Sequence, residues 1–73
     1  MKIIEQIHHG DYQSERTVEF PDDADPAAII AELLPSSAYC YQVPPPELQE
    51  KLAASLTEKG RFEHGWSRFW IEQ

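Results

Sequence analysis

The sequence contains little of several residue types on which common functional sites depend: one cysteine, three glycines and six basic residues. A single cysteine, Cys40, cannot form a disulfide within the chain, and a zinc site would need other ligand types beside it. We expect Cys40 to be a small buried hydrophobic residue. The three glycines form no G-x-G or G-K pattern, so the sequence lacks a glycine-rich phosphate-binding loop.

Long apolar runs are also missing. No stretch approaches the roughly 20 apolar residues that a membrane-spanning helix needs. The first twelve residues contain no apolar segment of the kind found in a signal peptide. A lone cysteine without a disulfide framework is typical of a reducing compartment. Together these features predict a cytoplasmic protein.

Acidic residues outnumber basic ones by thirteen to six, which gives a net charge of −7 at pH 7. Nucleic-acid binding depends on Lys and Arg that displace counterions from phosphates, so this charge argues against direct binding to nucleic acid or to an anionic membrane. The charge is also uneven, because residues 1–35 contain eight acids and two bases, whereas residues 36–73 contain five acids and four bases. Solubility alone, or a negative binding surface, would each explain such a chain.

The first 20 residues predict an antiparallel hairpin. Residues 2–8 contain three isoleucines, which favour a strand, and Gly10 and Asp11 favour a turn. Residues 13–20 alternate between a face directed toward the core and an acidic face. The first face has Arg16, Val18 and Phe20, and the second has Glu15, Thr17 and Glu19.

The remaining residues predict two helices and two further strands. Asp25 and Pro26 are typical of a helix start, and Pro35 ends this helix. We expect a third strand at residues 37–43, a second helix from Pro44–Pro46 to Gly60, and a strand or hairpin with a bulge or tight turn near Gly65. The predicted order is β-β-α-β-α-β, an α+β fold: one compact domain over residues 1–73, with one sheet and two helices packed on one face.

No metal site or cofactor site is complete. A calcium-binding loop counted from Asp23 would need oxygen ligands or glycine where Ala27, Ala28 and Leu34 stand. The neighbouring His8 and His9 would point to opposite faces of a strand, so they would not ligate one zinc ion together. We expect no metal and no cofactor.

Catalytic patterns are equally incomplete. The segment GWSRF begins like the nucleophile elbow G-x-S-x-G, but its last position is Phe69. Ser67 and His64 with an acid have the composition of a triad, which arises easily by chance in so acidic a chain. The acids near Asp22 lie in a loop next to proline, where a pocket that shifts their pKa values is not expected. The sequence therefore predicts a protein without enzymatic activity.

The acids of the N-terminal half predict a binding surface. They form an elongated series that would attract a basic surface of a partner protein. Their positions are Glu15, Glu19, Asp22, Asp23, Asp25 and Glu32. In size and charge the chain resembles small acidic inhibitors encoded by phages and mobile elements, including anti-CRISPR and anti-restriction proteins. This resemblance implies an inhibitor or decoy that occupies a nucleic-acid-binding surface of its partner.

The aromatic residues give an alternative. Eight of the 73 residues are Phe, Trp or Tyr. Aromatic side chains build cores, but they also anchor interfaces. If the sheet does not bury them all, Tyr39, Tyr41, Trp66 and Trp70 would form the contact surface of a dimerising, adaptor-type interaction module. The sequence does not decide between three interpretations: aromatic residues that only pack the core, this interaction module, and the acidic binding surface.

Overall fold

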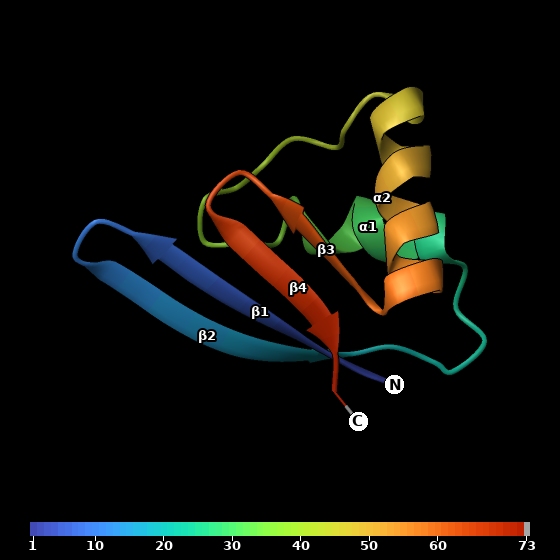
Figure 1. Cartoon of the computed structure of the whole chain (residues 1–73), viewed down its shortest axis with the longest axis horizontal. Helices are drawn as coiled ribbons and strands as arrows, with labels where there is room; N and C mark the ends of the chain where they lie inside the picture. Colours follow the sequence, from blue (N-terminus) through green and yellow to red (C-terminus); the bar gives the residue numbers. More distant parts are fainter. Residues whose placement is uncertain (73) are drawn as a thin grey trace.

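Two antiparallel hairpins form one sheet in a computed structural model, which describes residues 1–72 (Figure 1). The strands are β1 (Lys2–His9), β2 (Tyr12–Glu19), β3 (Arg61–His64) and β4 (Ser67–Ile71). Their order across the sheet is β2-β1-β4-β3, and each neighbouring pair is antiparallel. The first and last strands are therefore the central ones, which brings Ile3 opposite Ile71.

The two faces of β2 are as the sequence predicts. Val18 and Arg16 are half-buried and Phe20, just after the strand, is buried, whereas Glu15 and Glu19 are exposed. Alternation at a period of two therefore predicts the inward side of this strand correctly. The first hairpin and the α+β class are confirmed.

Two helices cover one face of the sheet. They are α1 (Pro26–Leu33) and α2 (Pro46–Lys59). Asp25 occupies the N-cap position of α1, although its side chain makes no capping hydrogen bond. Gly60 ends α2 with φ +70°, the left-handed conformation that favours glycine at this position. Neither helix is long and apolar enough to cross a membrane, and the described residues contain no other helix.

The core lies between the helices and this inner face of the sheet. Its buried side chains come from every strand except β2, together with both helices and the residues that follow β2 and α1. They are Ile3, Phe20, Ile29, Ile30, Leu33, Leu34, Leu52, Leu56, Phe62 and Phe69. The rings of Phe62 and Phe69 stack with centroids 4.5 Å apart, which joins the two strands of the second hairpin.

The predicted third strand is wrong: residues 37–43 form a loop, and the order is β-β-α-α-β-β. The backbone N–H of Ser37 bonds to the carbonyl of Leu34, and that of Cys40 bonds to the carbonyl of Ser37, as in successive turns. Cys40 has φ +49°, which interrupts any extended run. The prediction that Cys40 is buried is also wrong, because its side chain is exposed.

The predicted hairpin in residues 61–73 is confirmed for the part that the structure describes, and Gln73 lies outside it. Gly65, with φ +58°, and Trp66 form the turn between β3 and β4. This two-residue turn shifts the parity of the alternation, so that Phe62 and Phe69 both face the core. The tight turn near Gly65 therefore accounts for the change of phase along this segment.

The opposite face of the sheet, called the open face below, carries exposed or half-buried side chains. Register places Thr17, Ile4, Trp70 and Arg61 in one row across the four strands, and Glu15, Gln6, Arg68 and Glu63 in the next. Trp70 and Ile4 are the large apolar residues of these two rows, and both are half-buried. The open face is thus mainly polar.

Candidate binding surfaces

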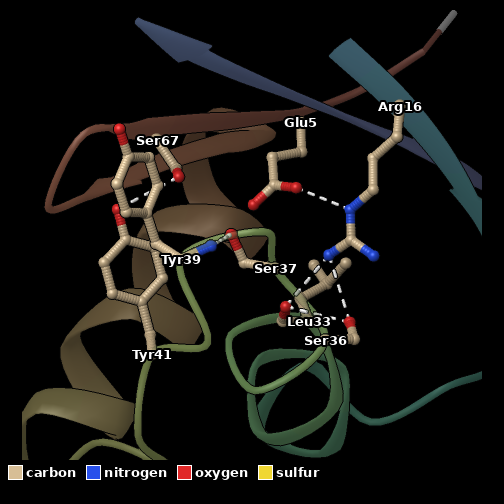
Figure 2. A network of polar contacts seen from close by, with 8 residues as sticks. All are labelled: Glu5, Arg16, Leu33, Ser36, Ser37, Tyr39, Tyr41 and Ser67. Carbon is tan, nitrogen blue, oxygen red and sulfur yellow. Dashed lines mark hydrogen bonds and ion pairs between the residues drawn. The ribbon is translucent and has the colours of Figure 1, made fainter. Parts of the chain in front are cut away.

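An ion pair between a buried carboxylate and a half-buried guanidinium group connects β1, β2 and α1. The Glu5 side chain is 1% exposed, and its Oε1 accepts a hydrogen bond of 2.5 Å from Nε of Arg16. Figure 2 shows Arg16 extending from β2 toward the end of α1, where its Nη2 donates to the carbonyl of Leu33 and to Oγ of Ser36, each at 3.1 Å. The base inside the acidic series is therefore directed inward.

Glu5 is not among the predicted site residues, although its position in the sequence carries a signal. Glu5 lies midway between Ile3 and Ile7, so the period of two places it on the buried side of β1. Arg16 lies directly across from it in the register. An acid in phase with buried isoleucines, opposite a base in phase with the inward face of β2, indicates a buried pair.

The predicted acidic residues lie on β2, the loop that follows it, and α1. We call this set the acidic edge: Glu15, Glu19, Asp22, Asp23, Asp25 and Glu32. All six are exposed. Glu15 and Glu19 lie on the open face of the sheet, whereas Glu32 lies on a helix that packs against the other face. The acidic edge therefore spans both layers of the molecule and does not form one flat surface.

Two members of the acidic edge have basic partners. The N-terminal ammonium of Met1 lies 2.7 Å from Oδ1 of Asp22, and its hydrogen bond and charge lower the pKa of that carboxyl. Lys2 Nζ lies 4.0 Å from Oε1 of Glu19. Within residues 1–72 the other four form no ion pair. These are Glu15, Asp23, Asp25 and Glu32.

Three of the four aromatic residues of the alternative surface lie together at one end of the sheet. Tyr39 and Tyr41 come from the loop between the helices, and Trp66 comes from the turn between β3 and β4. Further rings from the strand ends join them. We call the whole set the aromatic end: His9, Tyr12, Tyr39, Tyr41, His64 and Trp66. The structure does not place Trp70 there, because it lies on the open face beside Ile4.

Each ring of the aromatic end contacts at least one other ring of the set. Trp66 stacks on His9 with centroids 4.0 Å apart and planes 12° apart. His9 Nδ1 forms a hydrogen bond of 3.0 Å with the hydroxyl of Tyr39. The centroid of the Tyr39 ring lies 5.8 Å from that of Tyr12 and 6.1 Å from that of Tyr41. Burial, and then the neighbouring Tyr12 and Tyr41, raise the pKa of Tyr39.

Tyr41 attaches the helix-connecting loop to the second hairpin. Its hydroxyl accepts hydrogen bonds from the backbone N–H of Trp66 at 2.9 Å and from Oγ of Ser67 at 3.3 Å. A Cβ at Gly65 would lie 2.7 Å from the Tyr41 ring and hydroxyl, so glycine permits this approach. His64 packs edge-on against the same ring at 5.0 Å. The loop is thereby fixed without strand pairing.

Exposure distinguishes the members of the aromatic end. Tyr39, Tyr41 and His64 are half-buried, whereas Tyr12 is 45% exposed and Trp66 is 52% exposed. One face of the Trp66 indole stacks on His9, so the exposed surface of Trp66 lies on the remainder of the side chain. His9 is exposed as well. The half-buried rings fix the geometry, and the outer rings of Tyr12 and Trp66 are accessible to a partner.

The residues considered for catalysis or metal binding have other contacts. His64 and Ser67 lie opposite each other in the register, but Ser67 is 1% exposed and its hydroxyl donates to Tyr41. A nucleophile so buried would not reach a substrate. Across residues 1–72, no three His, Cys, Asp or Glu side chains lie close enough to hold a metal ion.

Two shallow concavities lie along the strands, and Gln6 and Arg68 line both. The larger, about 800 Å³, extends from Trp70 to the end of α2, and the smaller, about 440 Å³, lies beside Glu15. Arg68 is engaged with Glu63, since its Nε lies 3.5 Å from Oε1 of that residue. Polar side chains make up most of both linings, whereas small-molecule pockets are lined predominantly by apolar ones.

Comparison with protein-family models, with curated proteins and with solved structures finds no match to this chain. Inferences about its function therefore rest on the residues and their geometry.

Proposed function

We propose that this chain is a small, non-enzymatic protein-binding module that occupies a basic, nucleic-acid-binding surface of a partner protein. It would act as an inhibitor or decoy, as phage and mobile-element proteins of the anti-CRISPR and anti-restriction kind do. The observation that carries the proposal is the lack of basic partners for most of the acidic edge. Four of its six acids lack an ion pair within residues 1–72, and Arg16 is directed inward to Glu5.

The spacing of the acids suits an elongated basic surface. Glu15 and Glu19 are four residues apart on one strand face, which corresponds to about 13 Å. Asp23 and Asp25 extend the charge beyond the end of the strand. Because the spacing between Glu15 and Glu19 exceeds the Debye length of roughly 8 Å at physiological ionic strength, each acid needs a base of its own, and a cleft lined by several Arg and Lys would supply them. Such a field speeds association and selects basic partners.

Reversing the loop charges is expected to abolish binding. In the variant with Asp22→Lys, Asp23→Lys and Asp25→Lys, capture of nucleic-acid-binding proteins from a lysate on immobilised chain should fall by about tenfold or more at low salt. For the unchanged chain, the captured proteins should elute steeply with NaCl and should be displaced by added double-stranded DNA. Quantitative mass spectrometry of the eluates measures both effects.

A charge-matched control separates location from net charge. Glu47, Glu50 and Glu58 are exposed on α2, so changing these three to lysine alters the net charge equally. This control should retain most of the binding. Equal losses in the two variants would show that net charge alone attracts the captured proteins, and salt-insensitive capture would contradict the proposal.

A second candidate function is a dimerising, adaptor-type module, and the gathering of Tyr39, Tyr41 and Trp66 favours it. Exposed aromatic residues anchor many interfaces, because they bury a large area at a small cost in conformational entropy. Trp66, Tyr12 and His9 are the exposed members of this end. They would form the centre of an interface between two copies.

Sedimentation velocity over a range of protein concentrations tests this candidate. A concentration-dependent dimer is expected for the unchanged chain, and Trp66→Ala should remove it. Trp70→Ala is the matched control, since Trp70 lies on the open face away from the aromatic end. A chain that stays monomeric throughout, or a dimer that both variants weaken equally, would exclude dimerisation through this surface.

A further inference from the structure

We propose that the aromatic end binds an arginine side chain of the basic partner, with its guanidinium group stacked on the exposed indole of Trp66. This inference rests on the proposed function, because it names the residues that would anchor a basic partner. It also adds a second contact to the one made by the acidic edge. The strength of this second contact depends on stacking as well as on net charge.

The outer rings are accessible and already positioned. Trp66 is 52% exposed while His9 covers one face of its indole at 4.0 Å, so the opposite face is open to a ligand. His9 is itself bonded to Tyr39, and the backbone of Trp66 is bonded to Tyr41. A site whose rings are already fixed loses little conformational entropy when it binds.

The charge around these rings favours a cation. The segments that build the aromatic end are residues 8–13, 35–45 and 64–67, and they contain no lysine or arginine. Asp11 is their one carboxylate and is exposed. No lysine or arginine of these segments therefore competes for the free ring faces, although His9 covers one face of Trp66. The chain as a whole has a net charge of −7. A cation above an indole or phenol ring is attracted by the ring quadrupole.

The chemistry of the ligand points to arginine rather than lysine. A planar guanidinium stacks on an aromatic face and is more weakly hydrated than an ammonium group. Arginine is also enriched on surfaces that bind phosphates, which are the surfaces that the acidic edge would occupy. One partner surface would thus supply charge to the acidic edge and a stacking side chain to the aromatic end.

Two peptide probes test the inference: acetylated, amidated hexaarginine and the matching hexalysine. Calorimetry at low salt should show that the unchanged chain binds hexaarginine more tightly than hexalysine. Trp66→Ala should weaken hexaarginine binding by about threefold to thirtyfold and remove the preference for arginine. Trp70→Ala should leave both affinities unchanged. In the unchanged chain, the indole N–H resonance of Trp66 should shift on addition of hexaarginine, which tests the contact without any substitution.

The outcomes separate this inference from the proposed function. If Trp66→Ala keeps the arginine preference, or the Trp66 resonance does not move, the inference is overturned while the acidic edge can still account for binding. If reversal of Asp22, Asp23 and Asp25 leaves hexaarginine binding intact but Trp66→Ala removes it, the inference stands and the acidic edge is not the binding surface. Equal binding of both peptides by the unchanged chain also overturns it.

Discussion

Replacing Arg16 by methionine should lower the free energy of unfolding by about 3–5 kcal/mol, because it leaves the Glu5 carboxylate buried without its basic partner. Glu5 is 1% exposed, and its Oε2 already has no hydrogen-bond partner within the described residues. The substitution also removes the bonds from Arg16 to Leu33 and Ser36 at the end of α1. Folded domains have about 5–15 kcal/mol of stability in total, so the loss would be large. Urea denaturation monitored by circular dichroism measures it.

Two further variants establish the cause of this loss. Arg68→Met removes a base from an exposed pair, in which both side chains are at least 70% exposed, and should cost less than about 1 kcal/mol. The double variant Glu5→Leu, Arg16→Met replaces the buried pair by apolar side chains and should recover most of the stability. If the double variant is as unstable as Arg16→Met alone, the unpaired Glu5 carboxylate is not the cause of the lost stability.

Replacing Gly65 by alanine should destabilise the protein by about 1–3 kcal/mol more than the same change at Gly10. Both glycines have φ near +60°, so each substitution carries the same backbone strain of about 1–2 kcal/mol. A Cβ at Gly10 meets no atom within 4 Å, whereas at Gly65 it meets the ring and hydroxyl of Tyr41 at 2.7 Å. The difference between the two variants, measured by urea denaturation, is therefore the cost of displacing Tyr41.

A double-mutant cycle checks the part played by Tyr41. In a Tyr41→Ala background the ring and its two hydrogen bonds are absent, so Gly65→Ala and Gly10→Ala should then cost the same. An extra cost at Gly65 that persists without Tyr41 would place the strain in the turn itself. The cycle thus tests whether Tyr41 joins the helix-connecting loop to the second hairpin.

Local patterns in the sequence predict much of the fold. The alternation in residues 13–20 identifies the inward face of β2, because strand side chains point alternately to the two faces. Asp25 with Pro26, and Gly60, mark helix ends through their preferred backbone conformations. These preferences depend on each segment alone, so they predict its structure without knowledge of the tertiary contacts.

The wrong prediction at residues 37–43 has a long-range cause. The segment is rich in aromatic residues, which favours a strand locally, but its tyrosine side chains pack on the ends of both hairpins. Those contacts, together with the left-handed backbone of Cys40, replace strand pairing. The sequence names Tyr39, Tyr41 and Trp66 of the aromatic end but wrongly adds Trp70. It misses His9, Tyr12 and His64, because only the folded topology brings these segments together.

Pairing between β1 and β4 has a consequence for how the chain folds. Ile3 lies opposite Ile71, so the centre of the sheet joins residues from nearly opposite ends of the described chain (Figure 1). Closing so long a loop costs chain entropy before the contact returns any energy, and non-local pairing of this kind slows folding. During synthesis β1 and β2 can form a hairpin early, but the second edge of β1 has no partner until residues 67–71 are made. Until then the unpaired N–H and C=O groups along this edge of β1 can pair with strands of other proteins, so early pairing with β4 protects against aggregation.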